Sequence, residues 1–90
     1  IIVVHGTDTM CNTAKVIAET LGEESKKTVV LTGAMIPYSL EGSDAVFNLG
    51  TAIASVQLLP PGVYLTMSGR IFNWDNCRKN KEKGIFETIT

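Results

Sequence analysis

The chain has 90 residues, near the small end of the usual domain range of roughly 50 to 250, which predicts a single hydrophobic core. Hydrophobic residues make up 44% of the sequence and charged residues 19%, a balance that excludes disorder on compositional grounds. Eight lysines and arginines against nine aspartates and glutamates give a formal charge of -1, so nucleic acid is not an expected partner. No apolar run approaches the roughly 20 residues that cross a bilayer.

Strands and helices are predicted to alternate from the first residue onward. Residues 1–4 are a short β-branched run, which predicts a buried strand. A helix is expected from Met10, because apolar or small residues recur at helical spacing as far as Leu21, and Gly22 then provides a stop. After a charged connection, residues 28–32 predict a second apolar strand.

A second helix is expected to begin after Asp44, whose side chain suits the N-cap position. Pro60 and Pro61 are expected to end it. One face of this helix is predicted to consist of Phe47, Gly50, Ala54 and Leu58. Residues 62–67 then predict a third apolar strand, and residues 68–87 are expected to form a polar loop and tail.

This βαβαβ order predicts an α/β fold that is part of a parallel, doubly wound sheet with right-handed crossovers. Ligands of such folds bind beyond the carboxyl ends of the strands, so the loops after Val4, Thr32 and Met67 should meet at one edge. Any chemistry is therefore expected in these three loops. Three strands alone would have unpaired backbone groups on both sides, which predicts that the isolated chain self-associates or unfolds easily.

The loop after the first strand is a glycine turn followed by polar side chains, and two interpretations of them stay open. In the first, Thr7, Asp8 or Thr9 simply caps the following helix. In the second, Asp8 pairs with a substrate ammonium while Thr7 presents its hydroxyl to the reacting centre. His5 is expected to be structural, because a single histidine cannot form a metal cluster by itself.

The other two loops carry weaker signals. Gly33 and Ala34 either let backbone groups approach a ligand closely or form a plain turn. The charged residues between positions 70 and 83 predict a solvated loop. The glycine-rich phosphate-binding loops, the Gly-x-Ser-x-Gly elbow and the His-Glu-x-x-His zinc motif are all absent from the sequence.

Three sequence blocks follow one another near the expected strand ends: residues 5–10 (His-Gly-Thr-Asp-Thr-Met), 31–37 (Leu-Thr-Gly-Ala-Met-Ile-Pro) and 43–49 (Ser-Asp-Ala-Val-Phe-Asn-Leu). Together they resemble the bacterial-type L-asparaginases and glutaminase-asparaginases, and the resemblance runs over nearly the whole chain. It implies a parent amidohydrolase that converts L-asparagine, with L-glutamine as a second candidate substrate, to the acid plus ammonia through a threonine acyl-enzyme. It also implies a homo-oligomeric parent that needs no metal or organic cofactor.

The resemblance assigns roles to four residues. Thr7 corresponds to a catalytic threonine that works with a lysine, and Asp8 to the aspartate that holds the substrate's α-ammonium. Ala34 corresponds to the alanine that contacts the substrate amide through its backbone. An ungapped count from the third strand places the lysine at Lys79, beside Arg78. The choice has a chemical reason, because a desolvated lysine can give up its proton and a guanidinium cannot.

The chain also departs from the family pattern. The family's primary nucleophile is a threonine in a Gly-Gly-Thr-Ile segment, which does not occur here, and the serine block that binds the substrate carboxylate is missing too. The sequence starts at Ile1 without a methionine. Residues 1–90 are therefore expected to be part of an N-terminal asparaginase-type α/β domain, without its first hairpin or the C-terminal domain, and to be inactive alone.

Two alternative functions stay open. The asparaginase-like subunit of an archaeal-type tRNA-dependent amidotransferase shares these motifs and passes ammonia to a partner enzyme. A non-catalytic α/β binding module is the other alternative. The adjacent Thr7 and Asp8 argue against such a module, since a retired site has no chemical need for both.

Cys11 and Cys77 are far apart in sequence and form no Cys-x-x-Cys pair, which argues against a structural zinc site. As free thiols they favour a cytoplasmic location, with the periplasm as the alternative. Both follow predicted strands at the same edge of the sheet, so pairing between them stays open.

Overall fold

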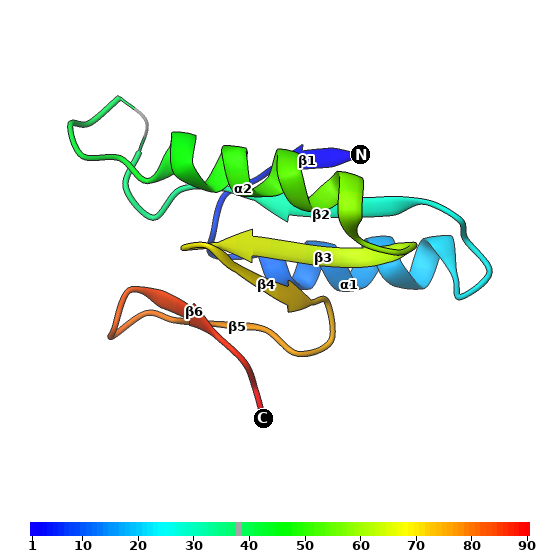
Figure 1. Ribbon diagram of the computed structural model, residues 1–90. Coiled ribbons are helices and arrows are strands. Elements are labelled where there is room, and N and C mark those ends of the chain that lie inside the picture. The colour runs from blue at the N-terminus through cyan, green and yellow to red at the C-terminus, as the bar shows by residue number, and fades with distance from the viewer. Residues whose placement is uncertain (38) are drawn as a thin grey trace.

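The computed structural model describes residues 1–37 and 39–90 as a mixed α/β fold (Figure 1). The first five elements are β1 (Ile2–Val4), α1 (Met10–Leu21), β2 (Thr28–Thr32), α2 (Ala45–Leu58) and β3 (Gly62–Met67). Three further strands follow: β4 (Arg70–Asn73), β5 (Arg78–Asn80) and β6 (Ile85–Glu87). The predicted βαβαβ order is confirmed, and β2 and β3 have the predicted bounds.

The central sheet has the strand order β1-β2-β3-β4, and its first three strands are parallel. The register places Val30 between Ile2 on β1 and Tyr64 on β3. The two helices cover opposite faces of this sheet (Figure 1). Val29 and Leu31 pack with Met10 of α1, and alternate strand residues point the other way, toward α2. The doubly wound arrangement predicted from the sequence is therefore present.

The prediction that residues 68–87 form a loop without strands is wrong. β4 pairs antiparallel with β3, and β5 pairs antiparallel with β6 in a separate two-stranded sheet. The turn between β3 and β4 consists of Ser68 and Gly69, both with positive φ (53° and 74°). Such a two-residue turn matches the twist of paired strands and so favours a hairpin. The Ser68-Gly69 pair is therefore a sequence signal for a hairpin turn. It was overlooked because the polar composition of residues 68–87 favoured a loop.

One hydrophobic cluster lies between α1 and the sheet and extends to the later strands. Leu65 and Met67 of β3 belong to it together with Phe72 of β4. Cys77 and Phe86 add contacts from the β5–β6 hairpin, which is thereby attached to the main body. Residues beyond β3 thus complete the core rather than form a solvated tail.

The face of α2 that carries Phe47, Gly50, Ala54 and Leu58 is the exposed face. Phe47 and Leu58 are 62% and 84% exposed, whereas Asn48, Ala52 and Ser55 face the sheet. Because most of the surface of α2 is apolar, hydrophobic spacing does not select one face. The small side chains of Ala52 and Ser55 let the helix approach the strands closely, and Asn48 is buried because its amide is hydrogen-bonded.

β1 is not the buried strand that its composition predicts. It lies at one edge of the sheet, and Val4 at its end is exposed. At the other end of the three parallel strands, β3 pairs with β4. The prediction that both outer strands have unpaired backbone groups is therefore wrong for β3. Neither helix in the described part of the chain is long and apolar enough to cross a membrane.

The close approach of the first two strand ends requires a glycine at position 33. A Cβ atom there would overlap the carbonyl oxygen of His5 and lie 2.9 Å from the Cε atom of Met10. We expect Gly33→Ala to destabilise the full-length protein by about 3 kcal/mol, at the upper end for overpacked sites. Gly50→Ala is the matched control, because its Cβ would meet nothing within 4 Å and alanine favours a helix. Urea unfolding of both variants measures the difference, and equal midpoints would contradict the expectation.

Candidate active site

The loops after β1, β2 and β3 meet at the carboxyl edge of the sheet, as predicted. The His5 N–H donates to the carbonyl of Thr32 at 2.9 Å, which joins the first two loops. Asn48 joins the second and third, because its amide donates to the carbonyl of Gly33 (2.8 Å) and its Oδ1 accepts from the Ser68 N–H (3.0 Å). No role for Asn48 was predicted from the sequence. The signal that could have found it is a carboxamide within an apolar helix.

Asp44 holds the loop after β2 rather than capping α2. It occupies the N-cap position but makes no capping hydrogen bond, so the predicted cap is wrong. Its carboxylate accepts from the N–H groups of Met35 and Ile36, both at 3.0 Å, and from the amide of Asn48 at 2.9 Å. Burial acts to raise the pKa of Asp44, but the donors on Ile36, Met35 and Asn48 together bring the pKa below its ordinary value.

The lowered pKa of Asp44 makes a stability prediction with a definite sign. The ionised carboxylate stabilises the fold above its unfolded pKa of about 3.9, and this contribution is lost as the pH falls through the lower folded pKa. We expect Asp44→Asn to cost about 2 kcal/mol near pH 7, and less once the pH is well below 3.8. Urea unfolding of both proteins across this range measures the change. Glu41→Gln, at an exposed carboxyl nearby, is the control, and an equal pH dependence of both variants would contradict the expectation.

The structure brings together three residues that were selected from the sequence. The ammonium of Lys79 donates to Thr7 Oγ1 at 2.7 Å and to Asp8 Oδ1 at 2.6 Å. Lys79 lies on β5 and is 72 residues from Thr7, so only the tertiary fold creates this contact. The lysine side chain is 17% exposed and that of Asp8 is 70% exposed. A shielded ammonium thus contacts a hydroxyl and a carboxylate that remains accessible.

Asp8 is adapted to stay ionised. Its pKa is lowered chiefly by the hydrogen bond from Lys79, with further attraction to the charges of Lys79 and Lys81. Asp8 Oδ2 has no hydrogen-bond partner among residues 1–37 and 39–90, so it is available to a ligand cation.

The interpretation in which a side chain of this loop caps α1 is wrong. Thr9 occupies the N-cap position of the helix, and its side chain makes no capping hydrogen bond.

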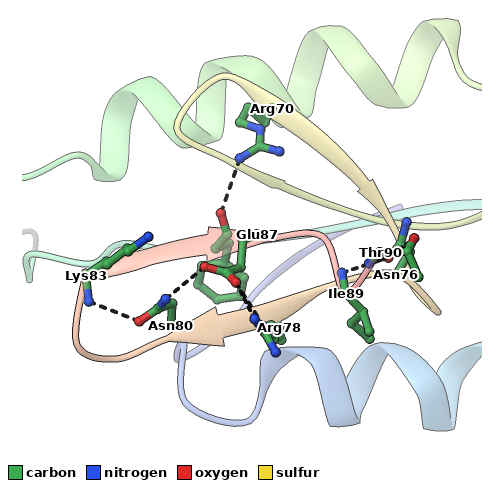
Figure 2. A network of polar contacts seen from close by, with 9 residues as sticks. Arg70, Asn76, Arg78, Asn80, Lys83, Glu87, Ile89 and Thr90 are labelled. Carbon is green, nitrogen blue, oxygen red and sulfur yellow. Dashed lines mark hydrogen bonds and ion pairs between the residues drawn. The ribbon is translucent and has the colours of Figure 1, made fainter.

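Arg78, the neighbour of Lys79, points to a different partner (Figure 2). Its Nη2 and Nε donate to Glu87 Oε2 on β6 at 2.7 and 2.9 Å, and Asn80 donates to Oε1 of the same carboxylate at 2.9 Å. The pKa of Glu87 is lowered by the hydrogen bonds from Asn80 and Arg78. Because side chains alternate along a strand, Lys79 projects to the opposite side from both neighbours. The contacts with Glu87 therefore place Arg78 and Asn80 on the side of the strand away from Thr7.

Ala34 lies apart from these three residues. It is half-buried and lines an apolar cavity of about 290 Å³ on the α2 side of the strand ends, together with His5, Gly33, Val46 and Leu49. Thr7, Asp8 and Lys79 do not line this cavity. A backbone contact from Ala34 to a substrate stays a prediction.

His5 makes hydrogen bonds with both ring nitrogens, as a structural residue would. Its Nδ1 is 2.7 Å from the carbonyl oxygen of Gly6, and its Nε2 is 3.0 Å from Thr13 Oγ1 on α1. In the described part of the chain, no group of three or more His, Cys, Asp or Glu side chains is placed to hold a metal ion.

Comparison with known proteins gives several matches. The L-asparaginase of Thermococcus kodakarensis is 35% identical over an alignment of 91 positions, which covers 99% of this chain and 27% of that protein. The human 60 kDa lysophospholipase is 37% identical over 79 residues, 87% of this chain and 14% of that protein. A subunit of the glutamyl-tRNA(Gln) amidotransferase of Methanococcus vannielii is 35% identical over 85 residues, 94% of this chain and 19% of that protein. The chain therefore spans only about a quarter or less of these relatives.

The structural comparison agrees with the sequence comparison. The solved structure of the thermostable L-asparaginase from Thermococcus kodakarensis has a TM-score of 0.85 and 30% identity, covering 99% of this chain and 27% of that one. Residues 1–87 match the family described as asparaginase, N-terminal. Since this match covers nearly the whole chain and the fold agrees with it, the chain belongs to the asparaginase N-terminal family.

Proposed function

We propose that the full-length protein is an amidohydrolase that releases ammonia from L-asparagine, and from L-glutamine as a second substrate, through a threonine acyl-enzyme. The observation that carries this proposal is the contact of Lys79 Nζ with both Thr7 Oγ1 and Asp8 Oδ1. Membership of the asparaginase family supports it. The chain spans 27% of the Thermococcus enzyme. We therefore further propose that residues 1–90 are part of an N-terminal asparaginase-type domain, and that other segments of the full-length protein complete the active site.

In the proposed reaction a threonine oxygen attacks the side-chain amide carbon of the substrate, and the carbon–nitrogen bond breaks. The nucleophile is a threonine from a Gly-Gly-Thr-Ile type of segment outside residues 1–90. Ammonia leaves after its nitrogen gains a proton, and water then hydrolyses the ester to the acid. Thr7 and Lys79 relay one proton: the nucleophile's hydroxyl proton passes to the Thr7 oxygen as Thr7 gives its own proton to the Lys79 amine, and the resulting ammonium gives that proton to the leaving nitrogen. The distance of 2.7 Å supports this role.

Asp8 and Ala34 are proposed to position the substrate. The exposed carboxylate of Asp8 keeps one oxygen free of partners in the described residues, and a substrate α-ammonium is a suitable cation for it. Ala34 contacts the side-chain amide through its backbone, at the end of β2. Holding the substrate at both points limits its motion relative to the reacting groups, and such positioning contributes several kcal/mol of barrier reduction.

Ammonia release by the full-length protein tests the proposal. Wild type should hydrolyse asparagine, and Asp8→Ala should raise KM for asparagine. Succinamate is asparagine without its α-amino group, so Asp8→Ala should lower kcat/KM much less for this analogue than for asparagine. No ammonia from asparagine or glutamine would overturn the proposal. Release of fatty acid from a lysophospholipid instead would assign the chemistry named for the human relative.

A second candidate is a subunit of a tRNA-dependent amidotransferase, which the match to the Methanococcus vannielii amidotransferase favours. Such a protein would release little ammonia alone and would become active when its partner protein and a misacylated tRNA are present. Addition of these components to the ammonia assay separates the two candidates. For either candidate we propose that the full-length protein is a homo-oligomer located in the cytoplasm. Gel filtration measures the oligomeric state, and cell fractionation measures the location.

A further inference from the structure

Two thiols from distant parts of the chain contact each other beside the candidate active site. The Sγ atoms of Cys11 and Cys77 are 2.8 Å apart, although the residues are separated by 66 positions. Cys11 lies in the first turn of α1 and is half-buried. Cys77 directly precedes β5, is 5% exposed and belongs to the hydrophobic cluster. Both are free thiols in this structure.

The position of this pair relates it to Lys79. Cys11 follows Asp8 by three residues, and Cys77 precedes Lys79 by two. The β5–β6 hairpin is a sheet of its own, with no backbone ladder to the four-stranded sheet. Side chains attach it: Phe86 packs in the hydrophobic cluster, Lys79 donates to Thr7 in the loop before α1, and Arg70 donates to the carbonyl of Phe86 at 3.5 Å. The thiol contact links the start of this hairpin directly to α1.

We propose that Cys11 and Cys77 are a reversible thiol–disulfide site, oxidised by a small-molecule disulfide of the glutathione type, and that the bond ties the β5–β6 hairpin to α1. The sulfur atoms already lie inside their van der Waals separation, so bond formation requires little movement of either backbone segment. The site is independent of the proposed amide hydrolysis, because thiol exchange uses neither Thr7 nor Lys79.

The two thiols have different roles in the exchange. The Cys77 thiol donates a hydrogen bond to Cys11, which lowers the pKa of Cys11 and raises that of Cys77. Cys11, which is also the more accessible, attacks one sulfur of the small disulfide and releases one small thiol. Cys77 then attacks the Cys11 sulfur and releases the second small thiol. The two protein thiols lose two protons and two electrons, and the small disulfide gains them.

The bond has a structural consequence for the hairpin. It closes a loop of the chain that contains β2, β3 and β4, and the β5–β6 hairpin can then no longer separate from α1 when its side-chain contacts open. Local opening is therefore slower in the oxidised form, and Lys79 stays near Thr7. In a reducing compartment the pair remains as thiols, and in an oxidising one it is a disulfide.

Incubation of the full-length protein with oxidised glutathione tests the site. Free thiols are then alkylated, and the digested protein is analysed by mass spectrometry. We expect a peptide that links Cys11 to Cys77, which dithiothreitol separates again. Hydrogen exchange of amides 78–87 should slow several-fold on oxidation and recover on reduction.

Cys11→Ser and Cys77→Ser are the matched controls, and each should abolish both the linked peptide and the slower exchange. Cys11→Ser preserves the test if the buried Cys77→Ser variant fails to fold. Alkylation of both cysteines after oxidation, or a glutathione adduct that stays on Cys11, would overturn the proposed disulfide. A linked peptide without slower exchange in the hairpin would overturn the tether. Neither readout depends on ammonia release, so this proposal and the proposed function fail separately.

Discussion

Lys79→Met in the full-length protein is expected to lower kcat for ammonia release by about 10²- to 10⁴-fold, the usual contribution of a positioned acid or base. The methionine side chain has a similar length and volume to that of lysine, but it has no amine that can donate or accept a proton. It removes the hydrogen bonds to Thr7 Oγ1 and Asp8 Oδ1 together. Steady-state kinetics with asparagine measure the loss, and circular dichroism verifies that the variant is folded.

Arg78→Met is the matched control for Lys79→Met, because it removes a cation from the adjacent position of the same strand. Its guanidinium is paired with Glu87 and is 60% exposed, so its removal should cost about 1 kcal/mol of stability or less. We expect kcat to remain within a few-fold of wild type. The opposite result, with turnover intact in Lys79→Met and lost in Arg78→Met, would show that the lysine role is assigned to the wrong residue.

Thr7→Val is expected to have the second large effect, a loss of kcat of about 10²-fold or more. Valine has nearly the same shape as threonine, so the variant removes the hydroxyl and leaves its volume. The Lys79 ammonium then loses the acceptor that lies at 2.7 Å in the wild type. Measurement of kcat and KM for asparagine separates this loss from weaker binding, and we expect the change mainly in kcat.

Two variants serve as controls for Thr7→Val. Thr9→Val changes the other threonine of the loop, whose side chain makes no capping hydrogen bond, and should leave kcat nearly unchanged. Thr7→Ser retains the hydroxyl and should recover much of the activity. Equal losses in Thr7→Val and Thr9→Val would indicate damage to the loop as a whole and would remove Thr7 from the proton path.

The elements of the central βαβαβ unit were predictable because their signals are local. β2 and β3 are apolar runs bounded by charged, glycine or proline residues, and both have the predicted bounds. α1 begins at Met10 and ends before Gly22, which adopts a φ of 76° that glycine tolerates. The short strands after β3 were missed, because segments of only three or four residues gain strand character mainly from their partners.

The candidate residues were predictable to different degrees. Thr7 and Asp8 are adjacent in a loop whose position follows from the strand order, so the sequence by itself locates them at the carboxyl edge of the sheet. Asp44 was predicted only as an N-cap, and no role was predicted for Asn48. Their hydrogen bonds join loops that are distant in sequence, so local patterns do not show them. The catalytic and substrate-binding roles of Thr7 and Asp8 stay predictions until the variants are measured.

What the sequence by itself determined about this protein is the alternation of strands and helices, the parallel sheet and the edge that carries the polar loops, because these depend on local propensity and chain connectivity. Only the tertiary structure decided which face of α2 is buried, and that Lys79, already selected from the sequence, contacts Thr7. It also decided that Cys11 meets Cys77. These contacts depend on the pairing of β4, β5 and β6 and on close packing between distant segments, and none of them is encoded in the spacing of neighbouring residues.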